Sequence, residues 1–94
     1  MTNSIGNYTQ DPNSTLDYRV DWTSWLDGDT IYTGAFSATP ALPNIIQSST
    51  TSSTVGTVWL SGLILGVTYV INHQVVTTLG RTDERSFIVT AVDQ

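Results

Sequence analysis

Cysteine and lysine are both absent from the sequence, and histidine and glutamate occur once each. The lack of cysteine excludes disulfides and any thiolate-bound zinc or iron–sulfur site. Three arginines against eight acidic residues give a net charge of −5. This balance argues against nucleic acid and anionic lipid as partners, because both are bound through basic side chains. So few titratable groups also argue against an enzyme, and we expect no catalytic residue, cofactor or metal.

Long hydrophobic runs are lacking as well. The most apolar stretch, residues 58–71, contains two glycines, a serine and a threonine, and it is shorter than the about 20 apolar residues of a membrane-spanning helix. It is better explained as two strands joined by a glycine-rich turn, and we expect no membrane contact. A chain of 94 residues and 10.2 kDa forms one domain with a modest core.

The residues that are abundant favour β-structure. Ten serines and sixteen threonines accompany many valines, isoleucines and aromatic residues, and such side chains suit a pleated strand better than a helix. Residues 16–22 alternate between apolar and charged side chains, which predicts a strand with one buried face. Further strands are expected at residues 29–38, 44–47, 55–60, 67–79 and 85–92, with an exposed loop over the serine–threonine run at 48–54.

These segments predict an all-β fold: a single immunoglobulin-like or fibronectin type III-like antiparallel β-sandwich of about seven strands. Residues 14–94 would form the sandwich. Residues 1–13 are polar and rich in turn formers, and would form an N-terminal arm that is free or laid on a neighbour. Tyr69 follows a glycine-containing turn, where a tyrosine hydroxyl in such folds bonds back to upstream backbone.

One short helical turn is predicted at residues 22–26. Trp22, Trp25 and Leu26 are spaced i, i+3, i+4, so that a single turn would place all three on one side. Gly28 permits a positive φ where the turn ends. Two interpretations stay open. The turn would either plug the end of the sandwich or present an aromatic patch to a partner, since tryptophan dominates interface hot spots.

Charge is distributed unevenly along the chain. Residues 30–80 contain no Asp, Glu, Lys or Arg. A small soluble monomer normally spreads charge over all its outer faces, whereas protein interfaces are depleted of charge at their centres. We therefore expect much of this segment to lie against other subunits. The alternative is a hydroxyl-rich surface like that of sugar-binding domains, with Trp59 or Tyr32 as an aromatic platform.

Two sets of residues carry a resemblance to a known family. They are Tyr8, Asp11-Pro12, Leu16-Asp17-Tyr18, Val20-Asp21-Trp22, Trp25-Leu26 and Gly28-Asp29-Thr30-Ile31 in the first half, and Trp59-Leu60-Ser61-Gly62, Gly66, Tyr69, Thr77-Thr78, Gly80-Arg81-Thr82 and Ser86-Phe87 in the second. Over about residues 8–92 the chain resembles small immunoglobulin-like virion proteins of tailed bacteriophages, of the fibre–tail adaptor, neck or head-decoration type. It departs from them at residues 63–65, where a second glycine and small polar residues are expected.

The resemblance implies a non-enzymatic building block of the virion, assembled in the cytoplasm of the bacterial host. Its partners would be other phage structural proteins (head–tail connector, tail or fibre) and copies of itself in a symmetric ring or lattice. Capsid decoration is the alternative within the virion, and a carbohydrate-binding or adhesin-type module is the alternative of another class. The residues that we expect to contact partners are Tyr8, Asp11, Pro12, Trp22, Trp25, Arg81, Asp83 and Arg85.

Overall fold

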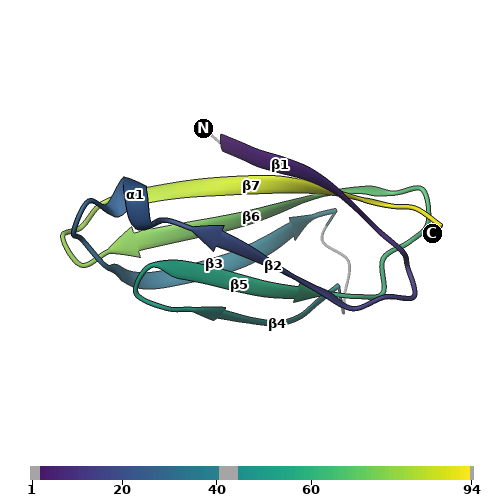
Figure 1. Cartoon of the computed structure of the whole chain (residues 1–94), viewed down its shortest axis with the longest axis horizontal. Coiled ribbons are helices and arrows are strands. Elements are labelled where there is room, and N and C mark those ends of the chain that lie inside the picture. The colour runs from purple at the N-terminus through teal and green to yellow at the C-terminus, as the bar shows by residue number, and fades with distance from the viewer. Residues whose placement is uncertain (1–2, 41–44, 94) are drawn as a thin grey trace.

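Two β-sheets and one short helix make up the protein (Figure 1). The computed structural model describes residues 3–40 and 45–93. The elements are β1 (Asn3–Gln10), β2 (Leu16–Asp21), α1 (Thr23–Leu26), β3 (Ile31–Thr39), β4 (Ile46–Thr51), β5 (Val55–Leu60), β6 (Thr68–Thr77) and β7 (Thr82–Ala91). The predicted all-β class, with about seven strands and one short helical turn, is confirmed.

The strand order places β3 and β4 together at one side of the sandwich. One sheet has the order β1-β7-β6-β3 and the other has the order β2-β5-β4. All neighbours are antiparallel except the parallel pair β1 and β7. At the opposite side β1 lies near β2, where the rings of Tyr8 and Tyr18 are 5.2 Å apart.

The core lies between the sheets and follows the alternation of the strands. Along β6 every second side chain is buried, from Tyr69 to Thr77. In β5 it is Val58 and Leu60 that face inward, while Trp59 points outward and is 42% exposed. The alternation alone left the choice between these two arrangements open. The buried apolar residues are Val20, Trp22, Leu26, Ile31, Ile45, Val58, Leu60, Leu63, Tyr69, Ile71, Val75, Phe87, Val89 and Ala91.

The tyrosine predicted to pin the turn before β6 does so. The Tyr69 hydroxyl accepts a hydrogen bond from the backbone N–H of Ile64, at 2.9 Å. The turn between β5 and β6 also carries Gly66 at φ +85°, a conformation that side chains with a Cβ rarely adopt. The departure from the family pattern at residues 63–65 therefore leaves this corner intact, with Leu63 buried in the core.

The N-terminal segment differs from the expected arm. Residues 3–10 form β1, which pairs in parallel with β7 of the same chain. Gln10 is fully buried, donates to the carbonyl of Leu60 at 2.8 Å and accepts from the Tyr18 hydroxyl at 2.8 Å. One amide thus links β1 to both strands β2 and β5 of the other sheet. The polar sequence of β1 has no apolar alternation that would predict a strand, and its partner β7 is the last strand of the chain.

Two further boundaries differ from the sequence prediction. Residues 48–51, expected in a loop, belong to β4, which pairs with β5. β7 begins at Thr82, so that Asp83 and Arg85 lie within the strand and not at the tip of the hairpin. The predicted short strand at 44–47 overlaps the start of β4 in its last two residues, and residue 44 lies outside the described residues. Both errors have one cause: hydroxyl-rich and charged residues give no apolar alternation.

Candidate protein–protein interface

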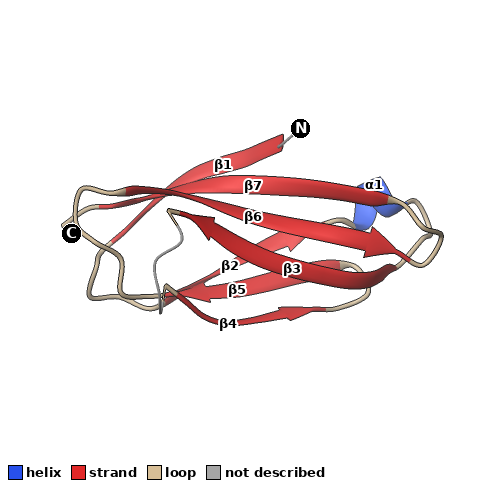
Figure 2. Ribbon diagram, turned by 180° about the vertical axis from the view of Figure 1, so that it is seen from behind, coloured by secondary structure: helices blue, strands red, loops and turns tan. Residues whose placement is uncertain are grey.

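Four of the predicted contact residues pack against one another. They lie beside α1, which is at one end of the sandwich (Figure 2). The rings of Trp22 and Trp25 lie 5.2 Å apart at an angle of 68°. Arg81 stacks its guanidinium 4.4 Å from the centre of the Trp25 ring, and Arg85 stacks at the same distance over Trp22. Cation–π contacts of this kind hold an arginine against an aromatic face. The chain thereby concentrates two of its three arginines at one end.

Arg81 fastens α1 to the rest of the sandwich. Its Nε donates to Asp29 at 3.2 Å, and its two terminal nitrogens donate to the carbonyls of Trp25 and Leu26 at 3.4 and 2.7 Å. The last carbonyls of a helix lack partners within the helix, so a cation that reaches them stabilises its end. Burial of the Asp29 carboxyl would raise its pKa, but hydrogen bonds from Thr77, the backbone and Arg81 outweigh that effect and lower the pKa.

Trp22 belongs to the core and not to the surface. It is fully buried, and its indole N–H donates to Nδ1 of His73 at 3.0 Å. Since an indole nitrogen only donates, Nδ1 must be unprotonated and the imidazole proton must sit on Nε2. Nε2 in turn lies 3.2 Å from the hydroxyl of Thr51 on β4. The interpretation of the helical turn as a plug therefore describes Trp22, while Trp25 is only partly buried.

His73 is fixed between the sheets by shape as well as by hydrogen bonds. Its ring stacks on Phe36 with 4.1 Å between centres and 10° between planes. A Cβ on Gly56 would overlap the imidazole, and a Cβ on Gly34 would come within 2.8 Å of its Nε2. Burial in this tight space lowers the pKa of His73 to about 4. The histidine is thus a neutral core residue at physiological pH.

Of the other four predicted contact residues, three lie elsewhere, and Asp83 lies between Arg81 and Arg85 in the sequence. Tyr8 on β1 is 43% exposed and packs edge-on against Phe87. Asp11 and Pro12 follow β1 in the turn before β2, at the end of the sandwich away from α1 (Figure 1). Asp83 lies near the start of β7, where its carboxylate accepts from the backbone N–H of Glu84. The eight residues therefore form no single patch.

One side of the sandwich carries no charged residue on its outer strands. The eleven charged residues lie on β2, on β7 and in the connections, and none lies on β3, β4, β5 or β6. Because β3 and β4 are the outer strands on the same side, the charge-free segment of the sequence becomes one long edge. We refer to β3 (Ile31–Thr39) and β4 (Ile46–Thr51) together as the neutral edge.

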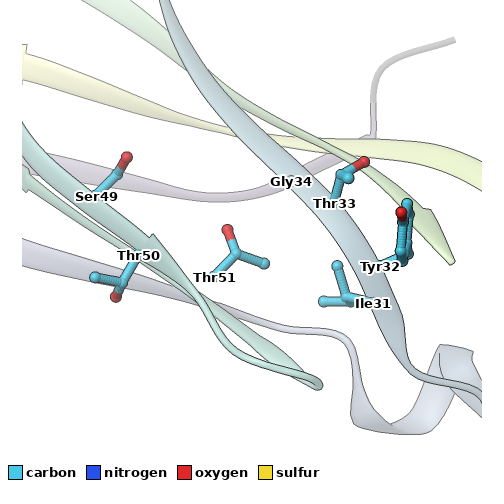
Figure 3. Close-up of a pocket in the computed structure, with 7 residues that line it drawn as sticks. All are labelled: Ile31, Tyr32, Thr33, Gly34, Ser49, Thr50 and Thr51. Atoms are coloured by element: carbon cyan, nitrogen blue, oxygen red, sulfur yellow. The ribbon is translucent and has the colours of Figure 1, made fainter. Parts of the chain in front are cut away.

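A groove of about 360 Å³ runs between the two strands of the neutral edge (Figure 3). Ser49 and Thr51 point into it from β4 and Ile31 from β3, whereas Thr50 points to the other side of its strand. Tyr32, 76% exposed, stands at its rim. The complete lining is Ile31, Tyr32, Thr33, Gly34, Ser49, Thr50 and Thr51.

Sequence reasoning did not single out these groove residues, apart from Tyr32 as a possible sugar platform. The sequence offers one signal for this surface, the absence of charge over residues 30–80. This signal identifies the segment, but it does not show which of its strands lie at the edges of the two sheets. That β3 and β4 lie side by side follows only from the pairing of each with strands later in the chain.

Metal-binding clusters and membrane-spanning helices are two features that the described part of the chain lacks. In residues 3–40 and 45–93, no three His, Asp or Glu side chains are grouped so that they could hold a metal ion. Within the same residues, no helix is long and apolar enough to cross a membrane. His73, the one imidazole, is enclosed in the core.

The protein is a small β-sandwich. Arg81 stabilises the aromatic cluster at its α1 end, and its neutral edge carries a groove. These features are typical of a structural protein that acts through its surfaces. Comparison with protein families agrees. A family model described as podophage GP4 fiber-tail adaptor protein gp77 matches residues 10–90, and the chain belongs to this family of phage fibre–tail adaptor proteins. The resemblance to tailed-phage virion proteins is thereby confirmed. No curated protein matches the chain significantly.

Proposed function

We propose that this chain is a non-enzymatic structural subunit of the phage particle. It would connect tail and fibre components through protein–protein contacts. Membership of the fibre–tail adaptor family supports this role. The observation that carries it is the neutral edge. A surface that long without an ionised side chain is unusual for an isolated domain and is typical of the centre of an interface.

The edges of the two sheets explain why contact would form there. Edge strands in monomeric proteins are commonly protected by lysine, proline or an inward-pointing charge, because their free backbone groups attract other strands. β3 and β4 have none of these residues between their first and last positions. The opposite side differs, since β2 carries Asp17, Arg19 and Asp21.

The predicted contact residues would add to this interface at two places. At the α1 end, Arg81 and Trp25 form an accessible arginine–aromatic pair, and the buried Trp22 would act only by supporting Arg85 above it. At the other end, Asp11 and Pro12 occupy the turn that follows β1. A subunit with separate surfaces at its edge and ends suits a position between several neighbours.

A phage that lacks this chain tests the proposal. We expect particles that still contain heads and tails but lose their fibres and no longer adsorb to host cells. Addition of the purified full chain should restore both. Fibres that remain attached without the chain would refute the role of adaptor. Loss of head stability with the fibres intact would instead favour capsid decoration.

Carbohydrate binding is a second candidate because of Trp59. Its indole is 42% exposed on the outer face of the three-stranded sheet, between Asp17 on β2 and Ser48 on β4 in the strand register. An exposed ring beside a carboxylate and a hydroxyl suits the apolar face and hydroxyl groups of a sugar. Binding of the chain on a glycan array, lost in Trp59→Ala and kept in Tyr32→Ala, would support this candidate.

A further inference from the structure

We propose that the neutral edge pairs strand to strand with the neutral edge of a second copy of this chain. The inference rests on the proposed function and deepens it, since it names the partner at one surface of the adaptor. Affinity would come from main-chain hydrogen bonds between extended strands, and the groove side chains would supply fit, as in other cases of strand addition.

The edge is open along most of its length. The backbone N–H of Ile31 donates to the carbonyl of Ser53 at 2.8 Å, which ties the start of β3 to the turn after β4. Next to this tie, Gly34 lies against Thr51. Beyond it the two strands belong to different sheets, and no described strand pairs with the outer side of either. A segment that enters here meets the outer side of β3 from Thr33 or of β4 from Ser48, where no described strand is paired.

The dimensions and chemistry of the groove favour an extended backbone as its occupant. The groove, about 360 Å³ in volume, is lined by residues of two extended strands, so a third extended segment can lie along them. The Ser49 hydroxyl faces the space and offers one donor and two acceptor sites. The Thr51 hydroxyl also faces it, but one of its acceptor sites is taken by Nε2 of His73. Such groups pair with peptide N–H and C=O groups without regard to the incoming sequence.

The distribution of charge favours a second copy of this chain as the partner at the neutral edge. Each chain carries a net charge of −5, so two copies repel one another over most orientations. Along the neutral edge two copies can meet without bringing ionised groups together, because all eleven charges lie outside β3 and β4. The same edge is hydroxyl-rich on both copies, which provides the self-complementarity that a two-fold contact requires.

Sedimentation of the purified full chain from micromolar to millimolar concentration tests the inference. We expect reversible self-association of the natural sequence. Thr33→Lys and Ser49→Lys place an ammonium at the edge and should weaken association by about tenfold or more, because a buried charge without a partner is costly. Ser24→Lys on α1 makes the same change of net charge away from the edge and should leave association unchanged.

Two controls keep the result interpretable. Urea unfolding of each variant establishes that it is folded. Amide hydrogen exchange of the natural chain should become slower in β3 and β4, but not in β2, as concentration rises. A chain that stays monomeric at millimolar concentration, or equal weakening by all three lysines, would overturn the inference. A monomer that still restores fibres to deficient phage would refute self-pairing alone and leave the adaptor role intact.

Discussion

Mild acidification, from pH 7 to pH 5, should destabilise this protein through His73. The pKa of His73 is lowered from 6.5 to about 4 by burial in the fold, while the unfolded chain keeps the ordinary value. Between these two values the unfolded state binds the proton and the native state does not, so the free energy of unfolding decreases as pH falls. The loss begins near pH 6.5 and is complete below about pH 4.

The size of the effect follows from the shift. One pKa unit corresponds to 1.36 kcal/mol, so the free energy of unfolding should fall by about 2 kcal/mol between pH 7 and pH 5, and by about 3 kcal/mol in total by pH 4. The geometry gives the reason. A proton on Nδ1 would face the indole N–H of Trp22, and the new charge would lie near the guanidinium of Arg85 over the same indole.

Urea unfolding followed by tryptophan fluorescence measures the effect directly. His73→Gln is the matched control, because an amide accepts and donates hydrogen bonds but does not titrate. Its stability should be nearly constant from pH 6.5 to pH 5. This range avoids Asp21 and Asp29, whose lowered pKa values place their titration below that of an ordinary aspartate. A flat profile for the natural chain, or an equal slope in the variant, would refute the assignment.

Three further predictions concern contacts that hold the fold. Tyr69→Phe removes the acceptor for the Ile64 N–H and should lower the free energy of unfolding by about 1 kcal/mol; an unchanged urea midpoint would contradict the corner's role. Gly56→Ala drives a methyl group into His73 and should cost about 1–3 kcal/mol, whereas Thr57→Ala on the outer face should cost much less in the same assay. Arg81→Ala removes the guanidinium that donates to Asp29 and to the α1 carbonyls, so it should lower the melting temperature more than Arg19→Ala. Equal effects of the two variants would show that these hydrogen bonds do not stabilise α1.

The parts of the fold that were predictable are those with a strong local pattern. The alternation over residues 16–22 located β2, and the spacing of Trp22 and Leu26 located α1. Tyr69 could be assigned its hydrogen bond because the turn before it is a recurrent local structure. In each case the information lies within a few consecutive residues, and the packed structure agrees with it.

The parts that were not predictable depend on distant partners. β1 is polar and is held by parallel pairing with the last strand, which no local pattern reveals. The serine–threonine run becomes β4 because β5 offers it a partner, and its exposed side chains carry no apolar signal. The hydrogen bond between Trp22 and His73 joins residues 51 positions apart, so no local pattern could predict it.

The candidate interface also has one part that the sequence predicts and one part that it does not. The absence of charge from residues 30–80 is visible in the sequence and correctly marks an unusual surface. Which strands of that segment lie at the open side is a property of the topology. The spacing of Trp22 and Trp25 predicts that they lie together, but only the structure shows that Trp22 is enclosed while Trp25 stays partly exposed beside Arg81.

The most direct measurement is a cryo-electron microscopy map of the virion at a resolution that traces this chain. The account predicts that Thr33 and Ser49 lie against a neighbouring subunit, with continuous density across the open side of β3 or β4, and that Asp17 and Arg19 on β2 face solvent or a partner of opposite charge. A map in which β3 and β4 face open solvent, and in which all contacts are made by β2 and β7, would contradict it.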